Sequence, residues 1–215
     1  ITKAENEIFN TEKDSLSAGA GRSVINLPSE FFPAENFTGI HDELYARVLL
    51  IQSSTKIAIV SLELTSLPNN EIIDLQKLVG VTAGLPAENV WICVTHTFSA
   101  PHIRSSSSLK TELEHKKNSM LRNAIEQALR EAAVKALSNL TYVRLGCGKG
   151  YCSVNVNRDI VTAKGWWLGS NESGTSDKSV EVIRFETMDG MPIAILFSYC
   201  IQSSIMDGST MSDGS

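Results

Sequence analysis

"LYARVLLIQSSTKIAIVSLEL" (residues 44–64) contains two apolar runs separated by a polar turn. The runs, 44–52 and 56–64, are rich in aliphatic and β-branched residues, and each has the length of a strand. The three residues between them, "SST", are typical of a hairpin loop. This stretch therefore predicts a β-hairpin at the centre of the fold.

The same plan recurs near the end of the sequence. "VEVIRFE" (180–186) and "PIAILFSYC" (192–200) are apolar runs joined by the turn "TMDGM", and the second strand of both hairpins contains "IAI". Further strands are predicted at "NVWICV" (89–94) and, around a glycine turn, at "TYVRLGCG" (141–148) and "GYCSVNVNR" (150–158). The recurrence suggests that the domain is internally duplicated.

Two segments between the strands have helical periodicity. In the first, Ile72, Leu75 and Val79 share a face, with Asn69 or Asn70 as the N-cap and Gly84 and Pro86 at the end. The second runs from about 118 to 139, and "SSSS" (105–108) before it predicts a mobile loop. Strands alternating with helices predict an α/β fold, a layered sandwich of mixed β-sheets with flanking helices. We expect a flexible lead-in at 1–18 and one α/β domain at 19–215.

Composition excludes some functions. The net charge of −5 and the pI near 5.4 argue against nucleic acid as a partner, and no apolar run approaches the roughly 20 residues of a membrane span. Four cysteines are present, and the five-residue spacing in "CGKGYC" suits neither a zinc site nor a redox pair. We expect buried, reduced thiols. Together with the absence of a signal-peptide pattern, they favour a cytoplasmic protein.

"VTHTFSAPH" (94–102) places His96 and His102 just beyond a predicted strand. Sites in layered α/β domains collect at strand ends, so His96 and Gln202, which follows the last strand, are expected to face one another. His96 is either a ligand or acid/base, or an ordinary hydrogen-bonded imidazole. His41 and Asp42 are adjacent on an extended segment, where side chains point apart, so a structural role is expected.

Trp166 and Trp167 lie in a stretch that reads as loop-rich. Two aromatic rings there either line a substrate pocket or pack against the fold, and packing is the expectation.

Six segments in order resemble the N-terminal domain of the neutral/alkaline non-lysosomal ceramidase family. They are "GAGRSVINLP" (19–28), "GIHDELYARVLLI" (39–51), "IAIVSLELTSL" (57–67), "VWICVTHTFSAP" (90–101), "VNVNRD" (154–159) and "VEVIRFETMDGMPIAILFSYC" (180–200). The resemblance implies a zinc amidase that hydrolyses an N-acyl amine, because zinc polarises the carbonyl and supplies hydroxide.

The resemblance also implies site residues. His96 matches the first histidine of the family's "THTHS", whereas Phe98 replaces the second, and the later metal histidine falls at Ile201 or Gln202. Asn157 and Arg158 match the family's "NR" pair, and Arg158 is expected to bind a carbonyl or carboxylate oxygen. The implied set is therefore His96 and Arg158 as catalytic residues, with Phe98, Ser99, Asn157 and Gln202 against the substrate.

His96 alone remains as a metal ligand in that set, so we expect an eroded zinc site, with zinc binding disfavoured. The family takes a further glutamate and tyrosine from a later part of its chain, so a second polypeptide completing the site is one possibility, and homo-oligomerisation is left open. Two alternatives remain. The chain is either the first subunit of a self-processed, metal-independent amidase, as the small polar tail 203–215 would suit, or a non-catalytic binding domain that keeps the fold.

Overall fold

The computed structural model describes residues 15–202, which form two compact units, here called the helical unit (15–143) and the strand unit (144–202). The elements are β1 (Ser17–Val24), β2 (Tyr45–Gln52), β3 (Lys56–Leu62), α1 (Asn69–Ala83), β4 (Val90–Val94), α2 (Glu112–Ser138), β5 (Thr141–Tyr151), β6 (Asn157–Thr162), β7 (Gly165–Asn171), β8 (Ser179–Thr187) and β9 (Pro192–Tyr199). Seven strands hydrogen-bond in the order β4-β3-β2-β1-β5-β8-β9, and β6 pairs with β7 alone. Expectations for residues 1–14 and 203–215 lie outside the described residues.

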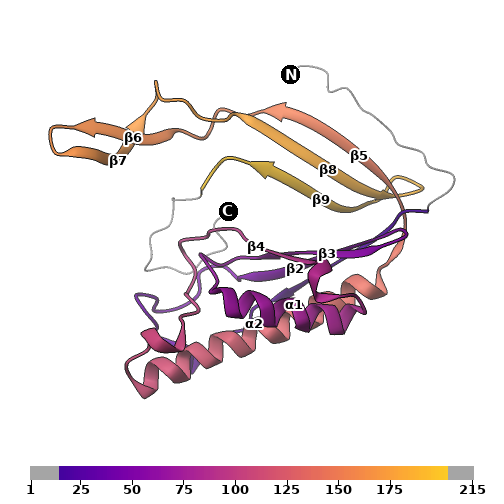
Figure 1. The fold of residues 1–215 in the computed structure, drawn as a ribbon, viewed down its shortest axis with the longest axis horizontal. Coiled ribbons are helices and arrows are strands. Elements are labelled where there is room, and N and C mark those ends of the chain that lie inside the picture. The colour runs from indigo at the N-terminus through magenta and orange to yellow at the C-terminus, as the bar shows by residue number, and fades with distance from the viewer. Residues whose placement is uncertain (1–14, 203–215) are drawn as a thin grey trace. The chain divides into compact units, whose positions relative to one another are not determined.

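The hairpin predicted at 44–64 is confirmed as β2 and β3. The pairs Ala46–Leu62, Val48–Val60 and Leu50–Ala58 lie directly opposite one another, and all six side chains are almost fully buried. Since side chains alternate between the faces of a strand, this register gives the hairpin one continuous apolar face. Both helices lie against this side of the sheet (Figure 1).

The predicted helix after β3 is α1, and it connects β3 to β4, which run parallel. All other pairings given are antiparallel, so the sheet is mixed, and the layered α/β fold class is confirmed. Gly84 ends α1 in the left-handed conformation, as expected of a C-cap glycine. The expected asparagine cap is wrong: Pro68 occupies the N-cap position, and Asn69 and Asn70 are the first helical residues.

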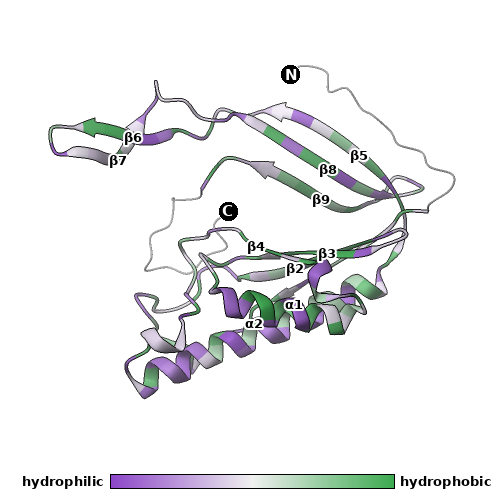
Figure 2. Ribbon diagram, in the orientation of Figure 1, coloured by the Kyte–Doolittle hydropathy of each residue, from purple (hydrophilic) through white to green (hydrophobic). Residues whose placement is uncertain are grey.

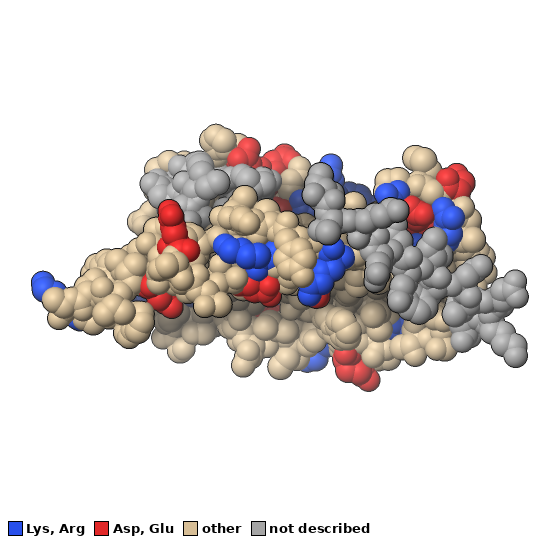
Figure 3. Space-filling view, turned by 90° about the horizontal axis from the view of Figure 1, so that it is seen from above, with Lys and Arg blue, Asp and Glu red and all other residues tan. Residues whose placement is uncertain are grey.

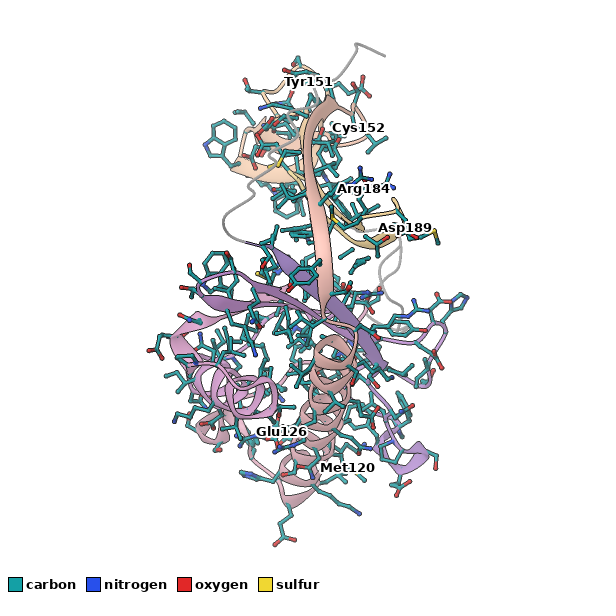
Figure 4. All side chains as sticks on the ribbon, turned by 90° about the vertical axis from the view of Figure 1, so that its right-hand side faces the viewer. Met120, Glu126, Tyr151, Cys152, Arg184 and Asp189 are labelled. Carbon is teal, nitrogen blue, oxygen red and sulfur yellow. The ribbon has the colours of Figure 1, made fainter. Side chains whose placement is uncertain are left out.

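Helix α2 begins at Glu112, six residues before the predicted start. The reason is a capping box: the Thr111 hydroxyl accepts from the Glu114 backbone N–H, and the Glu114 carboxylate accepts from the Thr111 N–H. This cap stabilises a first turn that is charged rather than apolar, which periodicity alone does not detect. Figure 2 shows hydrophilic and hydrophobic segments alternating along the helix, and Figure 4 labels Met120 and Glu126, two residues of this helix.

Glycine explains how closely β1 packs against α2. A Cβ added to Gly19 would lie 2.2 Å from the Ala136 carbonyl oxygen, and one added to Gly21 would lie 2.1 Å from the Ala132 oxygen. Real carbon–oxygen contacts are never this short, so only glycine fits at these two positions. The glycine-rich opening segment is therefore a packing feature of the helical unit.

The strand unit corrects three expectations. Strand β5 runs unbroken from Thr141 to Tyr151, so no glycine turn divides residues 141–158 as predicted. Trp166 and Trp167 lie on β7 rather than in a loop, and they are 73% and 69% exposed rather than packed. The predicted β8–β9 hairpin is confirmed, and its turn is closed by hydrogen bonds between Thr187 and Met191.

Other local expectations have mixed outcomes. The four cysteines are free, as predicted, but Cys93, Cys147 and Cys200 are exposed and Cys152 is only half-buried. The serine run contains a short 3₁₀ helix, Ser106–Ser108. His41 and Asp42 do not point apart, because the His41 Nδ1 lies 2.7 Å from the Asp42 carboxylate. Neither described helix combines the length and apolarity that a bilayer crossing needs.

Candidate functional site at the end of strand β4

The loop after β4 continues the sheet's hydrogen-bonding pattern for several residues. The N–H groups of Thr95 and Thr97 donate to the carbonyl oxygens of Leu62 and Leu64, at 3.0 and 3.2 Å. Because β3 and β4 are parallel, the chain leaves both strands at the same edge of the sheet. Residues that follow β3 therefore meet residues that follow β4, 30 or so positions later.

His96 is held in an unusual backbone conformation by this arrangement. Its φ is +57°, a left-handed value that few residues other than glycine adopt. The Nδ1 lies 2.8 Å from the carbonyl oxygen of Thr65, which follows β3. A carbonyl can only accept, so Nδ1 carries the proton and donates. In the neutral ring, Nε2 then holds the lone pair, and this nitrogen is the one suited to accept a proton or bind a ligand.

The neighbours of His96 alternate between buried and exposed positions. Thr97 and Ser99 are 3% exposed, whereas His96 and Phe98 point outward. The His96 and Phe98 rings lie 5.4 Å apart between centroids, at a tilt of 51°. Phe98, the residue predicted to replace a metal histidine, thus forms an apolar wall beside the imidazole. Ser99 is buried in the loop, which is where the structure places this predicted substrate residue.

Thr65 is the residue of this site that the sequence did not reveal. Its carbonyl oxygen orients His96, and its hydroxyl donates to the Thr97 carbonyl oxygen at 2.7 Å. The Thr95 and Thr97 hydroxyls also pair at 2.7 Å. Thr65 is 7% exposed, so water competes little for these bonds. The order of elements in the sequence, strand, helix and strand, could have indicated Thr65, because such a crossover makes β3 and β4 parallel and brings the residues that follow them together.

The remaining predicted residues belong to the strand unit. Asn157 donates to the Thr175 carbonyl oxygen and accepts from the Asp159 N–H, at 2.9 and 2.8 Å. Arg158 is exposed, and its Nε donates to the Gly169 carbonyl oxygen across the β6–β7 hairpin. Gln202 is exposed just beyond β9. The structure thus brings His96, Phe98 and Ser99 together in one loop, and Asn157 and Arg158 together on β6.

A buried polar cluster centres on Asn155, two residues before Asn157. Its side-chain amide donates to the carbonyl oxygens of Asp177 and Cys200, at 2.6 and 2.7 Å, and its backbone carbonyl oxygen accepts from the Lys178 ammonium. Tyr199 donates to the Cys152 carbonyl oxygen at 3.0 Å. These bonds tie the end of β9 to the segment between β5 and β6.

The same cluster shifts the pKa of a thiol. The Val154 backbone N–H, and after it the Tyr199 hydroxyl, lower the pKa of Cys152, while burial acts in the opposite direction. Figure 4 labels Tyr151 and Cys152 at one end of the strand unit and Asp189 at the opposite side, near the β8–β9 turn. Basic and acidic side chains lie next to one another on the face drawn in Figure 3. Ion pairs of the strand unit include Arg144–Glu186 at 2.9 Å and Lys149–Glu181 at 3.1 Å.

The residues present do not fit a catalytic zinc ion. A catalytic site needs about three protein ligands, and no group of three His, Cys, Asp or Glu side chains within residues 15–202 is placed to hold a metal. His96 is the one predicted ligand, and Phe98, two residues further on, has no atom that can bind a metal. We therefore assign no chemical step to a metal.

Comparisons with known proteins show similarity in structure but not in sequence. No protein-family model matches the chain, and no curated protein matches it in a sequence search. A solved ceramidase, described as complexed with C2, superposes with a TM-score of 0.71 at 19% identity. The neutral ceramidase from Pseudomonas aeruginosa superposes with a TM-score of 0.69 at 20% identity.

In both superpositions 94% of this chain is covered, but only 34% of the ceramidase chain. The chain thus spans about a third of the length of these ceramidases. At this identity the likeness concerns the fold alone. The described residues therefore have the fold of part of a neutral ceramidase.

Proposed function

We propose that the chain forms part of a ceramidase-like amide hydrolase that acts on an N-acyl amine or a related small amide. The fold likeness over 94% of the chain supports this class. The observation that carries the proposal is the bond from His96 Nδ1 to the Thr65 carbonyl oxygen, which leaves Nε2 as the basic nitrogen at the end of β4. Catalytic residues in α/β folds gather at such strand ends.

In this proposal His96 acts as the general base. Its Nε2 takes a proton from a water molecule that attacks the amide carbonyl carbon. The C–N bond then breaks, and the proton passes to the leaving amine nitrogen, giving a carboxylic acid and an amine. Phe98, whose ring centroid lies 5.4 Å from that of His96, offers an apolar surface for the acyl group.

The test is to incubate the natural full-length protein with a short-chain N-acyl amine and to measure the free amine that hydrolysis releases. His96→Ala is expected to lower kcat/KM by roughly 10²- to 10⁴-fold, the usual contribution of a general base. His115→Ala is the matched control, because His115 is exposed on α2. Equal activity of the two variants would contradict the role of His96.

A non-catalytic binding domain is the second candidate. The replacement of a metal histidine by Phe98 and the lack of a three-ligand cluster among the described residues favour it. It predicts no amine release from any N-acyl amine by the full-length protein, with measurable binding of the same amides. Amine release that depends on His96 would exclude this candidate.

A further inference from the structure

His102 and Glu35, 67 residues apart in the chain, form a pair in the helical unit that the proposed function does not use. The Glu35 carboxylate accepts from the His102 backbone N–H with one oxygen and from the ring Nδ1 with the other, both at 2.8 Å. The imidazole is thereby fixed in orientation, and Nε2 is the ring nitrogen that Glu35 leaves unbonded. The buried neighbours Ala100 and Ile103 hold the His102 backbone on both sides.

A tight backbone turn holds Glu35 in position. Ala34 and Phe37 exchange two backbone hydrogen bonds of 3.0 and 2.8 Å, and both are buried, so they anchor a tight turn in the core. Glu35 lies in that turn with φ of +52°. A residue other than glycine in this region costs conformational energy, and such positions concentrate at binding and catalytic sites.

The pair lines a pocket of about 140 Å³ at the start of α2. Its apolar wall consists of Phe31, Ala34, Leu109 and Leu121, and its polar wall of Glu35, His102, Arg104, Glu114, Lys117 and Asn118. Cavities of roughly this size bind benzene in other proteins. The pocket is therefore large enough for one small ring or a branched aliphatic group.

The polar wall is rigid. Asn118 accepts from the Arg104 N–H at 2.8 Å and donates to the Arg104 carbonyl oxygen at 3.1 Å, which ties this loop to α2. The Arg104 guanidinium faces Glu114 at 3.5 Å. The Glu114 carboxylate is itself held by the capping box of α2. A ligand would meet a preformed wall, which reduces the entropy cost of binding.

The charged side chains of this wall differ in the kind of partner that each one has. Glu35 pairs with His102, and Glu114 pairs with Arg104. The Lys117 ammonium donates to the Pro33 carbonyl oxygen, and within residues 15–202 it makes no ion pair with a carboxylate. Lys117 is thus the cation at the pocket that has no carboxylate partner among the described residues, and it is the group available to a ligand with one negative charge.

We propose that this pocket binds a small carboxylate attached to an apolar group about the size of benzene. The apolar group fills the space between Phe31, Leu109 and Leu121. The carboxylate lies against Lys117, beside the ring of His102. None of these residues belongs to the site at the end of β4, and the proposal stands or falls independently of the amidase activity.

Benzoate is the probe, and the readout is the amide NMR signals of Arg104 and Asn118 in the natural full-length protein. Benzoate is expected to shift these signals saturably. Acetate, which lacks the ring, and benzyl alcohol, which lacks the charge, are expected to bind more weakly by roughly tenfold or more. Failure of benzoate to shift these amides, or equal affinity for all three probes, would overturn the proposal. This comparison needs no variant and so does not depend on how a variant folds.

Lys117→Met and Lys116→Met form a matched pair, because the neighbouring Lys116 is exposed on the same helix and does not line the pocket. Methionine keeps most of the apolar stem and removes the charge. Lys117→Met is expected to weaken benzoate binding by roughly tenfold or more, as loss of a charge-assisted hydrogen bond does, while Lys116→Met leaves it unchanged. Equal weakening by both would show that general charge attraction, and not this pocket, holds the anion.

Discussion

Gly21→Ala tests the close packing of β1 against α2. The new methyl group would lie 2.1 Å from the Ala132 carbonyl oxygen and 2.6 Å from the Ala136 nitrogen, two atoms of the helix backbone. Neither atom can turn aside as a side chain does, so the helix must move by about 1 Å from the sheet. Overpacking a core usually costs about 1–3 kcal/mol, and the rigid neighbour places this change at the upper end, near 3 kcal/mol. The loss of glycine flexibility in the unfolded chain returns less than about 1 kcal/mol.

Urea unfolding followed by hydrogen exchange of the α2 amides measures this loss in the helical unit itself. With a urea m-value of about 2–3 kcal/mol/M, the net loss of about 2–3 kcal/mol lowers the midpoint by about 1 M. Gly39→Ala is the matched control, because no atom lies within 4 Å of the Cβ it would add. It is expected to leave the midpoint unchanged or slightly raised. If both variants lower the midpoint equally, the glycines of β1 are not required by packing.

Two further predictions concern charges on the helices. Hydrogen bonds from the backbone N–H groups of Lys110 and then Thr111 lower the pKa of Glu114, so the stabilisation from its carboxylate is present above the pKa of the unfolded chain and is lost as pH falls through the lower pKa of the folded chain. Glu114→Gln should therefore unfold more easily than the natural protein at neutral pH, and acid titration of both proteins should show that this difference vanishes. Arg122 pairs with the buried Glu71 at 3.2 Å, so Arg122→Met should lower the free energy of unfolding by about 2 kcal/mol, less than for a fully buried pair because the arginine is partly exposed. Thermal melts should show that adding Glu71→Gln restores part of this stability, and no restoration would argue against an uncompensated carboxylate as the cause.

The sequence predicts elements well where one apolar face decides the structure. Strands β2, β3, β8 and β9 follow from alternating or continuous apolar runs and from the turns between them. Prediction failed where a local hydrogen bond decided instead. The capping box of Thr111 and Glu114 extends α2 beyond its apolar pattern. Conversely, the glycines of 141–151 are accommodated within β5 because strand pairing outweighs their preference for turns.

The two histidines of "VTHTFSAPH" show what a sequence reveals about a site and what it omits. His96 follows β4 and Thr65 follows β3, and a helix of 15 residues between the strands implies parallel pairing, so their proximity follows from the order of elements. The positive φ of His96 does not follow from that order, yet it accompanies the bond that sets the tautomer. His102 has its partner in a turn 67 residues earlier, in a segment without periodicity. The order of strands thus predicts where the His96 ring lies. The position of the His102 ring depends instead on the packed loop, in which Glu35 is held at a positive φ.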